Sequence, residues 1–241
     1  MWQQLTWKFV AAAWLAALAA TAQADDAAVR ATLERTFPQN PIQGIAKTPV
    51  PGLVEAAIGG RVVYVTEDGL FILGGPLIDV NAKRNLSDAR LEQINAIPFD
   101  SLNLEWAIKI VKGKGTRKVA IFEDPDCPYC RALEKAMRDV DDLTVYVFLY
   151  PIDQLHPEAS AKSRAVWCAS DPAKAWTEVM RSGTVPTGAA TCANPLAKIA
   201  AFAIQHRING TPTTILSDGR RMVGAVPREQ LEARLQGAAR P

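Results

Sequence analysis

Cys127-Pro128-Tyr129-Cys130 follows an apolar run, Val119 to Phe122, and opens a stretch of helical periodicity, Arg131 to Val140. The pattern predicts a strand, a C-x-x-C motif and a helix, in that order. A thiol at the start of a helix lies beside unsatisfied backbone N–H groups and the positive end of the helix dipole, and both favour its thiolate form. Pro128 suits the first helical turn, where a missing N–H is no loss. The motif therefore indicates thiol–disulfide exchange, with Cys127 as the nucleophile.

Residues 1–24 are predicted to form a secretory signal peptide. Lys8 precedes an apolar core, Phe9 to Ala20, and Ala22-Gln23-Ala24 fits cleavage after Ala24. The core is shorter than the roughly 20 apolar residues that span a bilayer. We therefore expect export to an oxidising compartment, a bacterial periplasm, and a mature chain that begins at Asp25.

The charge of the chain excludes several classes of partner. The 241 residues include 27 basic and 25 acidic side chains, and the formal net charge is +2. No basic block or aromatic-interleaved patch is present, so no nucleic acid or membrane-surface partner is expected. Neither a Gly-rich phosphate loop nor a Ser/His/Asp set is found, and we expect no cofactor.

All four cysteines lie in the C-terminal half of the chain. An even number of cysteines in an exported protein implies pairing, and four cysteines allow three connectivities. The C-x-x-C spacing makes a Cys127–Cys130 bond natural and leaves Cys168 to form a structural disulfide with Cys192. The alternative is a four-cysteine zinc site, but such sites usually use paired C-x-x-C units, and the last two cysteines stand far apart. No metal is therefore expected.

An N-terminal domain is predicted over residues 25–81. Val29, Leu33 and Phe37 mark the apolar face of a short helix that ends at Pro38. Glycine turns then separate β-rich segments into a meander, in which strands are expected over residues 53–58, 61–66, 70–73 and 77–80. Such a small sheet has open edges, so it can pair with a second copy of itself or pack on the other domain.

A linker is predicted over residues 82–103. Its helix, 87–97, would have Ser87 as N-cap and stop before Pro98, and it is polar enough to be a solvated connector. The second domain, 104–241, opens with Trp106, Ile108 and Ile110 in alternation, which indicates a strand, although a helix over residues 104–111 is an alternative. A hairpin-like turn at residues 112–115 and a strand over residues 117–123 are expected next.

The second domain continues as strand, helix, strand, helices, two strands and a helix. Leu133, Met137 and Val140 lie on the apolar face of the helix behind the cysteines, and Leu143–Leu149 is apolar enough for a central strand covered on both faces. The further elements are expected as helices over residues 157–169, 173–181 and 195–207, a hairpin of strands 213–216 and 221–224, and a helix from Pro227 that carries Leu231 and Leu235.

The C-terminal section resembles a thioredoxin-fold domain, and the whole chain resembles the DsbC/DsbG family of periplasmic thiol:disulfide interchange proteins in the thioredoxin-like superfamily. The strongest sign is the ordered combination of the C-x-x-C motif with Thr211-Pro212 some 80 residues later. The resemblance rests on Val63–Gly69, Gly75–Val80, Phe122–Cys130, Ala165–Ala169 and Gly210–Pro212.

This resemblance implies a small N-terminal cystatin-like dimerisation domain of a helix and an antiparallel sheet. A linker helix and a C-terminal thioredoxin-like α/β fold with a helical insertion would follow it. It also implies a V-shaped homodimer around an apolar cleft. Pro212 would be a cis-proline beside the cysteines, and Thr211 would present backbone groups to an extended substrate segment.

The resemblance further implies an isomerase mechanism. Cys127 attacks a wrong disulfide of an unfolded or misoxidised exported protein, and either a substrate thiol or Cys130 resolves the mixed disulfide. A membrane reductant similar to DsbD would keep the pair reduced. The dipeptide Pro128-Tyr129 tunes the reduction potential; DsbG carries the same dipeptide, whereas DsbC carries Gly-Tyr. A DsbG-like reductase of sulfenylated cysteines and a holdase chaperone with secondary redox activity are therefore alternatives.

Many thioredoxin-fold proteins place a buried acid six residues before the first cysteine, where it helps to move the proton of the second cysteine. This chain has Ile121 at that position. Glu123 and Asp124 are nearby, and both are interpreted as solvated surface charges without a catalytic role. His156 and His206 are likewise interpreted as surface residues.

Overall fold

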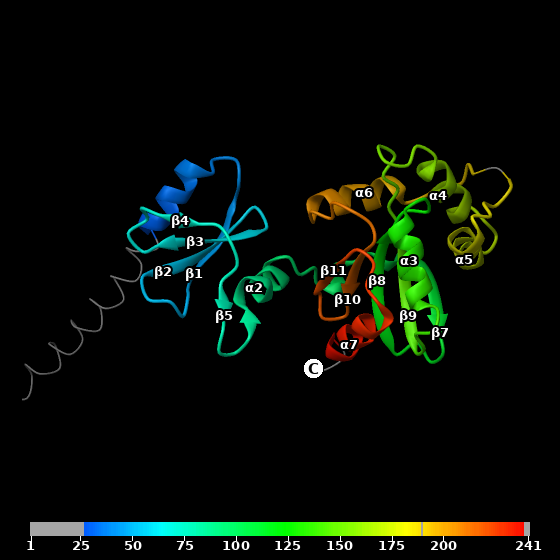
Figure 1. The fold of residues 1–241 in the computed structure, drawn as a ribbon. Coiled ribbons are helices and arrows are strands. Elements are labelled where there is room, and N and C mark those ends of the chain that lie inside the picture. The colour runs from blue at the N-terminus through cyan, green and yellow to red at the C-terminus, as the bar shows by residue number, and fades with distance from the viewer. Residues whose placement is uncertain (1–26, 189, 239–241) are drawn as a thin grey trace, which may run out of the picture. The chain divides into compact units, whose positions relative to one another are not determined.

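The computed structural model describes residues 27–188 and 190–238 (Figure 1). The predicted signal peptide lies outside the described residues. The chain divides into two compact units, one up to Ile94 and one from Asn95 onward. None of the helices within the described ranges is both long and apolar enough to cross a membrane.

The first unit contains a helix over residues 27–36 and a four-stranded antiparallel sheet in the order β1-β2-β3-β4. Val29 and Leu33 are fully buried and pack with Val54 and Val65 of the sheet, which confirms the predicted helix face. The strands are β1 (Ile42–Lys47), β2 (Leu53–Ile58), β3 (Arg61–Thr66) and β4 (Ile72–Leu73). The first of them is not predicted from the sequence, because Gly44 interrupts its pattern, and in the structure its register with β2 is irregular at this residue.

A second small sheet follows in the same unit. β5 (Ile78–Asp79) pairs with β6 (Arg84–Asn85), and α2 (Leu86–Ile94) begins directly after β6. The prediction of Ser87 as N-cap is wrong, because its hydroxyl is buried against the Tyr64 hydroxyl inside the unit. Asn85 is the N-cap instead, because its side-chain oxygen accepts hydrogen bonds from the backbone N–H groups of Ser87 and Asp88.

The linker helix is present as α2, but it is not a solvated connector. It packs on β3 and β5, and the Arg90 guanidinium forms an ion pair of 2.6 Å with Glu55 of β2. The helix also ends three residues earlier than predicted. Ile97 is instead fully buried in the second unit, where its N–H donates to the carbonyl oxygen of Gly219. Gly219 has a positive φ of 85°, and a Cβ there would lie 2.9 Å from the Ile97 oxygen, so this turn requires glycine.

The second unit is built on a mixed five-stranded sheet in the order β11-β10-β8-β9-β7. β8 and β9 are parallel, and every other pair is antiparallel. The strands are β7 (Ile108–Lys112), β8 (Arg117–Glu123), β9 (Leu143–Leu149), β10 (Thr213–Leu216) and β11 (Arg221–Val223). The prediction of a hairpin between β7 and β8 is wrong, because β9 lies between them. All seven residues of β9 are buried, as expected for a strand inside the sheet.

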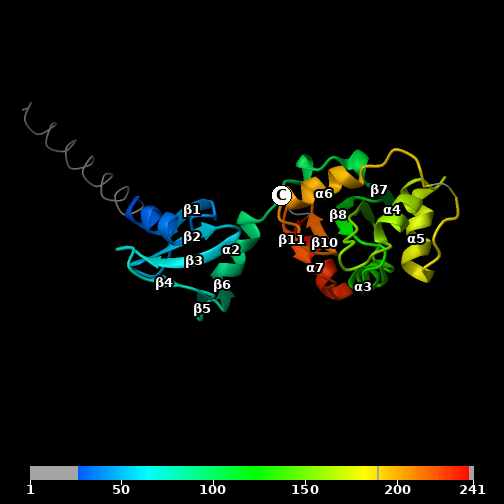
Figure 2. The same cartoon turned by 90° about the horizontal axis from the view of Figure 1, so that it is seen from above.

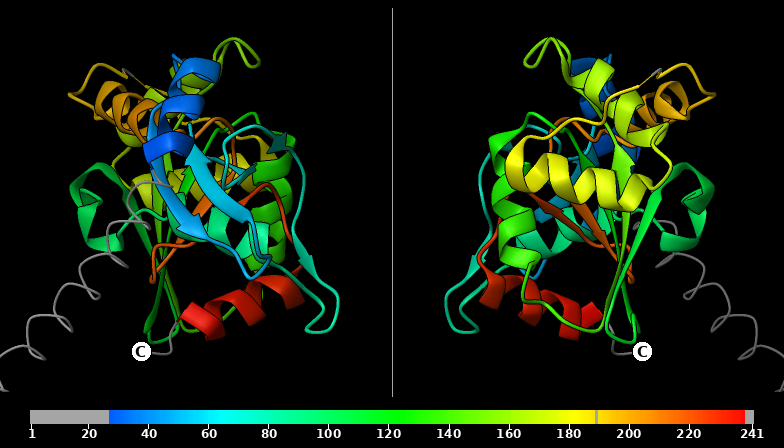
Figure 3. Two further views of the ribbon diagram at one scale, coloured as in Figure 1. Left: turned by 90° about the vertical axis from the view of Figure 1, so that its left-hand side faces the viewer. Right: turned by 90° about the vertical axis from the view of Figure 1, so that its right-hand side faces the viewer.

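Helices cover both faces of this sheet. Figure 2 shows α6 on one side of β8 and β10 and α3 and α7 on the other, and α7 is the red helix of Figure 3. The helices are α3 (Pro128–Met137), α4 (Ala159–Trp167), α5 (Pro172–Ser182), α6 (Leu196–Gln205) and α7 (Arg228–Ala238), with 3-10 turns at Phe99–Ser101 and Leu104–Trp106.

Alternation along β8 divides the core into two layers. Val119 and Ile121 face α3, α5 and α7, whereas Ala120 and Phe122 face α6. The Phe122 ring stacks on that of Phe148 at 4.8 Å between centroids. The layer toward α3 therefore carries the cysteines.

Candidate redox site

Cys127 occupies the N-cap position of α3, and Pro128 is the first residue of the helix. The Cys127 backbone is extended, with φ −70° and ψ 121°, so the chain turns from the loop into the helix at this residue. Cys127 is 5% exposed and Cys130 is fully buried, and neither thiol is in a disulfide. The exposed rim of the site is formed by Pro128 and by Tyr129, whose side chain is 65% exposed.

The loop before β10 lies against the first cysteine. The Cys127 thiol donates to the carbonyl oxygen of Thr211 at 3.4 Å. The Thr211–Pro212 peptide bond is cis, and Pro212 is buried. The carbonyl oxygen of Pro212 accepts from the N–H of Gly224 at 2.8 Å, which ties this loop to the end of β11. The fold thus brings the C-x-x-C motif and Thr211-Pro212 together.

Glu123 is fully buried, and its interpretation as a surface charge is wrong. It is the last residue of β8 and follows Val119 and Ile121 on the inward face. Burial raises the pKa of Glu123 well above its ordinary value, and the neighbouring Glu134 carboxyl raises it further. The alternation of β8 was the signal in the sequence that could have placed this side chain inside.

Asp124 is also fully buried, so its interpretation is wrong as well. Its carboxylate accepts from the backbone N–H of Asp126 at 2.8 Å and from that of Ile152 at 2.7 Å. The His156 ring lies beside it, with Nδ1 at 3.1 Å from a carboxylate oxygen. Asp124 therefore joins the loop before Cys127 to the segment after β9.

The two thiols differ in their surroundings. The backbone N–H of Asp124 donates to Cys130 Sγ at 3.5 Å. Burial raises the pKa of the Cys130 thiol strongly, and the negative charge of Glu123 adds to this effect. Cys130 therefore keeps its proton at neutral pH unless a neighbouring group takes it.

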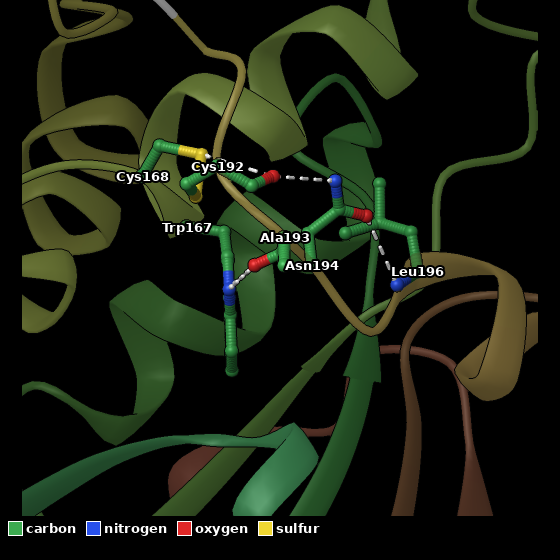
Figure 4. The surroundings of a disulfide bond; sticks show 6 residues. All are labelled: Trp167, Cys168, Cys192, Ala193, Asn194 and Leu196. Carbon is green, nitrogen blue, oxygen red and sulfur yellow. Dashed lines mark hydrogen bonds between the residues drawn. A yellow bond between two sulfur atoms is a disulfide. The ribbon is translucent and has the colours of Figure 1, made fainter.

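The remaining cysteines form a disulfide between Cys168, the C-cap of α4, and Cys192 (Figure 4). Beside it, the Trp167 indole N–H donates to the carbonyl oxygen of Ala193 at 3.2 Å, and the Asn194 amide donates to that of Cys192. This disulfide fastens the segment before α6 to α4. Across the described residues, no three His, Cys, Asp or Glu side chains group closely enough to hold a metal ion.

His206 ends α6 and is partly buried rather than free on the surface. The centroid of its ring lies 4.1 Å from that of Phe202. Burial lowers the pKa of His206 most, and the positive charge of Arg221 lowers it further. It lies in the layer away from the cysteines.

Two family models match the chain and together span both units. The model described as the disulfide bond isomerase protein N-terminal domain matches residues 20–88, and the thioredoxin-like domain matches residues 104–239. A Bordetella parapertussis protein named "Probable thiol:disulfide interchange protein DsbC" is 42% identical over 89% of this chain and 77% of its own length. The chain belongs to the DsbC family.

Two further relatives agree with this assignment. The Escherichia coli thiol:disulfide interchange protein DsbC is 33% identical over 90% of each chain. The crystal structure of a disulfide interchange protein from Neisseria gonorrhoeae is 44% identical, with a TM-score of 0.56, and covers 58% of this chain and all of that one. The two-domain fold predicted from the sequence is confirmed. As a DsbC family member, the protein is a thiol–disulfide oxidoreductase with disulfide isomerase function, and nothing in the comparisons favours the DsbG-like or holdase alternatives.

Proposed function

We propose that Cys127 is the attacking cysteine of this isomerase and that Cys130 is the resolving one. The Cys127 thiolate attacks one sulfur of a wrong substrate disulfide, forms a mixed disulfide and releases the other substrate sulfur as a thiolate. If that thiolate attacks a different sulfur of the substrate, the disulfide is rearranged and Cys127 is regenerated. If Cys130 attacks Cys127 instead, the substrate leaves reduced and the active site becomes a disulfide.

The position of Thr211 supports a role for its loop in holding substrate. The loop lies within hydrogen-bonding distance of Cys127, so an extended segment bound along it would place its sulfur next to the nucleophile. Pro128 and Tyr129 lie on the exposed rim, where they contact the incoming chain and tune the reduction potential. The Cys168–Cys192 disulfide has a structural role.

The partners follow from this assignment. The protein acts on misoxidised exported proteins in the periplasm after removal of residues 1–24, and a DsbD-like membrane reductant keeps its cysteines reduced. The match to the isomerase N-terminal domain supports a homodimer formed through residues 25–81, with the linker over 82–103 and the catalytic domain over 104–241. Exposed apolar side chains at and near edge strand β4, those of Leu70, Phe71 and Leu73, suit such pairing.

One observation carries the proposal: a nearly buried thiol begins a helix, and a fully buried thiol lies one turn behind it. The test is refolding of a multi-disulfide enzyme with scrambled disulfides in the presence of the reduced protein. The wild type should restore the enzyme's activity, Cys127→Ala should restore none, and the double variant Cys168→Ala/Cys192→Ala should remain active. Full activity of Cys127→Ala would refute the proposal.

A further inference from the structure

Cys130 must lose a proton before it can attack Cys127, and this inference rests on the resolving role proposed above. The thiol is fully buried, and its pKa is raised. No water reaches it directly, so the proton has to pass to a neighbouring group.

The carboxylate of Asp124 is already engaged by other hydrogen-bond donors. Both of its carboxylate oxygens already accept backbone N–H groups, those of Asp126 and Ile152, and His156 lies beside them. The contact of Asp124 with Cys130 is made by its backbone N–H, which is a donor. Its side chain therefore holds the loop.

The carboxyl group of Glu123 is available to accept the Cys130 proton. Within the described residues neither of its carboxyl oxygens has a hydrogen-bond donor, although the side chain is fully buried. Its charge acts on both cysteine thiols. A buried carboxyl without donors is expensive for the fold, so its presence beside two reactive thiols calls for a functional explanation.

Glu134 connects Glu123 to solvent. It lies four residues after Cys130 on α3, so the two side chains share one face of the helix. The Trp176 indole N–H donates to one Glu134 oxygen at 2.9 Å and fixes the carboxyl next to that of Glu123. Glu134 also lines a surface pocket of about 530 Å³, and cations line the same pocket: Lys112, Arg131, Lys135, Arg138 and Arg181.

We propose that Glu123 and Glu134 form a proton relay between the Cys130 thiol and the water of this pocket. During resolution, Glu123 first passes its carboxyl proton to Glu134, which releases it to water. The Glu123 carboxylate then takes the Cys130 proton, and the Cys130 electron pair forms the Cys130–Cys127 bond. The bond from Cys127 to the substrate breaks, and the substrate sulfur leaves as a thiolate.

The relay works in reverse when an external dithiol reduces the active site. The dithiol forms a bond with Cys127, the Cys127–Cys130 bond breaks, and Cys130 leaves as a buried thiolate. The Glu123 carboxylic acid protonates it and regains its proton from the pocket through Glu134. Because burial raises the pKa of Glu123 toward that of a thiol, transfer in either direction is less uphill than it would be with an ordinary carboxyl.

The test separates the two chemical steps with 5,5′-dithiobis(2-nitrobenzoic acid). Attack by Cys127 releases one coloured thiolate in a bimolecular phase, and attack by Cys130 releases the second in a unimolecular phase. We expect Glu123→Gln to slow the second phase by about 100-fold at neutral pH and to change the first phase far less. Glu134→Gln should slow the second phase by about tenfold.

The control is Glu178→Gln, which removes a half-exposed carboxyl from α5, outside the pocket. It should match the wild type in both phases. In the wild type, the second phase should accelerate as pH rises through the raised pKa of Glu123, and Glu123→Gln should lose this inflection.

The relay is refuted if Glu123→Gln, shown by circular dichroism to be folded, keeps a second phase within about twofold of the wild type. If that variant does not fold, Glu134→Gln becomes the test, and an unchanged second phase in Glu134→Gln refutes the relay. If the wild type has no second phase, or Cys130→Ala retains it, the resolving role itself fails.

Discussion

Cys127 and Thr211 are 84 residues apart in the sequence, and the thiol of the first donates to the carbonyl oxygen of the second at 3.4 Å. The contact joins the start of α3 to the loop before β10. It gives Cys127 a fixed neighbour on the side where a substrate chain would arrive, while Cys130 lies inside the protein.

This difference predicts that Cys130→Ala traps substrates. Without the resolving thiol, a mixed disulfide on Cys127 is released only by a substrate or external thiol. Non-reducing gels of the variant with a scrambled substrate should show a covalent complex that reductant removes. Cys127→Ala is the control and should form none. A variant of Cys130 that releases substrate as fast as the wild type would contradict the assignment.

The two thiols should also differ in alkylation. Cys130 is fully buried and its pKa is raised, so little thiolate is accessible to iodoacetamide at neutral pH. Mass spectrometry of the reduced protein should find label on Cys127 well before Cys130, with both labelled after denaturation. Equal labelling rates in the native protein would show that Cys130 is reachable.

Replacing Glu123 with leucine should stabilise the fold. The side chain is buried without a donor among the described residues, and removing such a group is worth about 1–3 kcal/mol in the free energy of unfolding. The folded-state pKa of Glu123 is raised above the ordinary 4.5, so the folded protein binds the extra proton. The contribution of Glu123 to stability is therefore greatest below pH 4.5 and is lost as pH rises through the folded-state pKa.

Urea unfolding at several pH values checks this sign. The advantage of Glu123→Leu over the wild type should grow from acidic to neutral pH, whereas Glu178→Leu, a substitution at a half-exposed position, should show no such trend. An advantage that shrinks with rising pH would mean that the Glu123 carboxylate is stabilised in the folded protein.

The disulfide between Cys168 and Cys192 should contribute stability without contributing chemistry. It closes a loop with a sequence separation of 24, for which chain entropy predicts about 3 kcal/mol. Cys168→Ala/Cys192→Ala should lower the free energy of unfolding by this amount and keep both phases of the nitrobenzoate reaction. Loss of either phase in the folded variant would show that the disulfide also shapes the site.

The strands β2, β3, β8 and β9 follow the predicted bounds, because runs of β-branched and apolar residues between glycine or acidic turns carry a strong local signal. The pairing of β7 could not be predicted in this way. Its partner is β9, which arrives only after α3, and the glycine turn between β7 and β8 looks like a hairpin when read locally. The pairing of β7 therefore depends on the assembly of the whole sheet, which the local sequence does not show.

The cysteines were predicted from the motif, but the acids beside them were not. A charged residue normally lies in solvent, so the sequence predicts exposed positions for Glu123 and Asp124. Asp124 is buried because the backbone N–H groups of Asp126 and Ile152 replace water at its carboxylate. Glu123 is buried by its inward position on β8, at the expense of its hydrogen bonds. Strand position outweighs residue type at Glu123, and hydrogen bonds from backbone N–H groups do so at Asp124.

The burial of Cys130 also determines the order in which other molecules can bind at the site. Cys130 is fully buried and Cys127 is only slightly exposed, so other molecules can reach the site only at Cys127. Under the proposed mechanism, a misoxidised substrate and the reductant of the active site both react at Cys127, so one must dissociate before the other can bind. Turnover then follows a ping-pong mechanism, in which a rising concentration of substrate competes with the reductant of the active site.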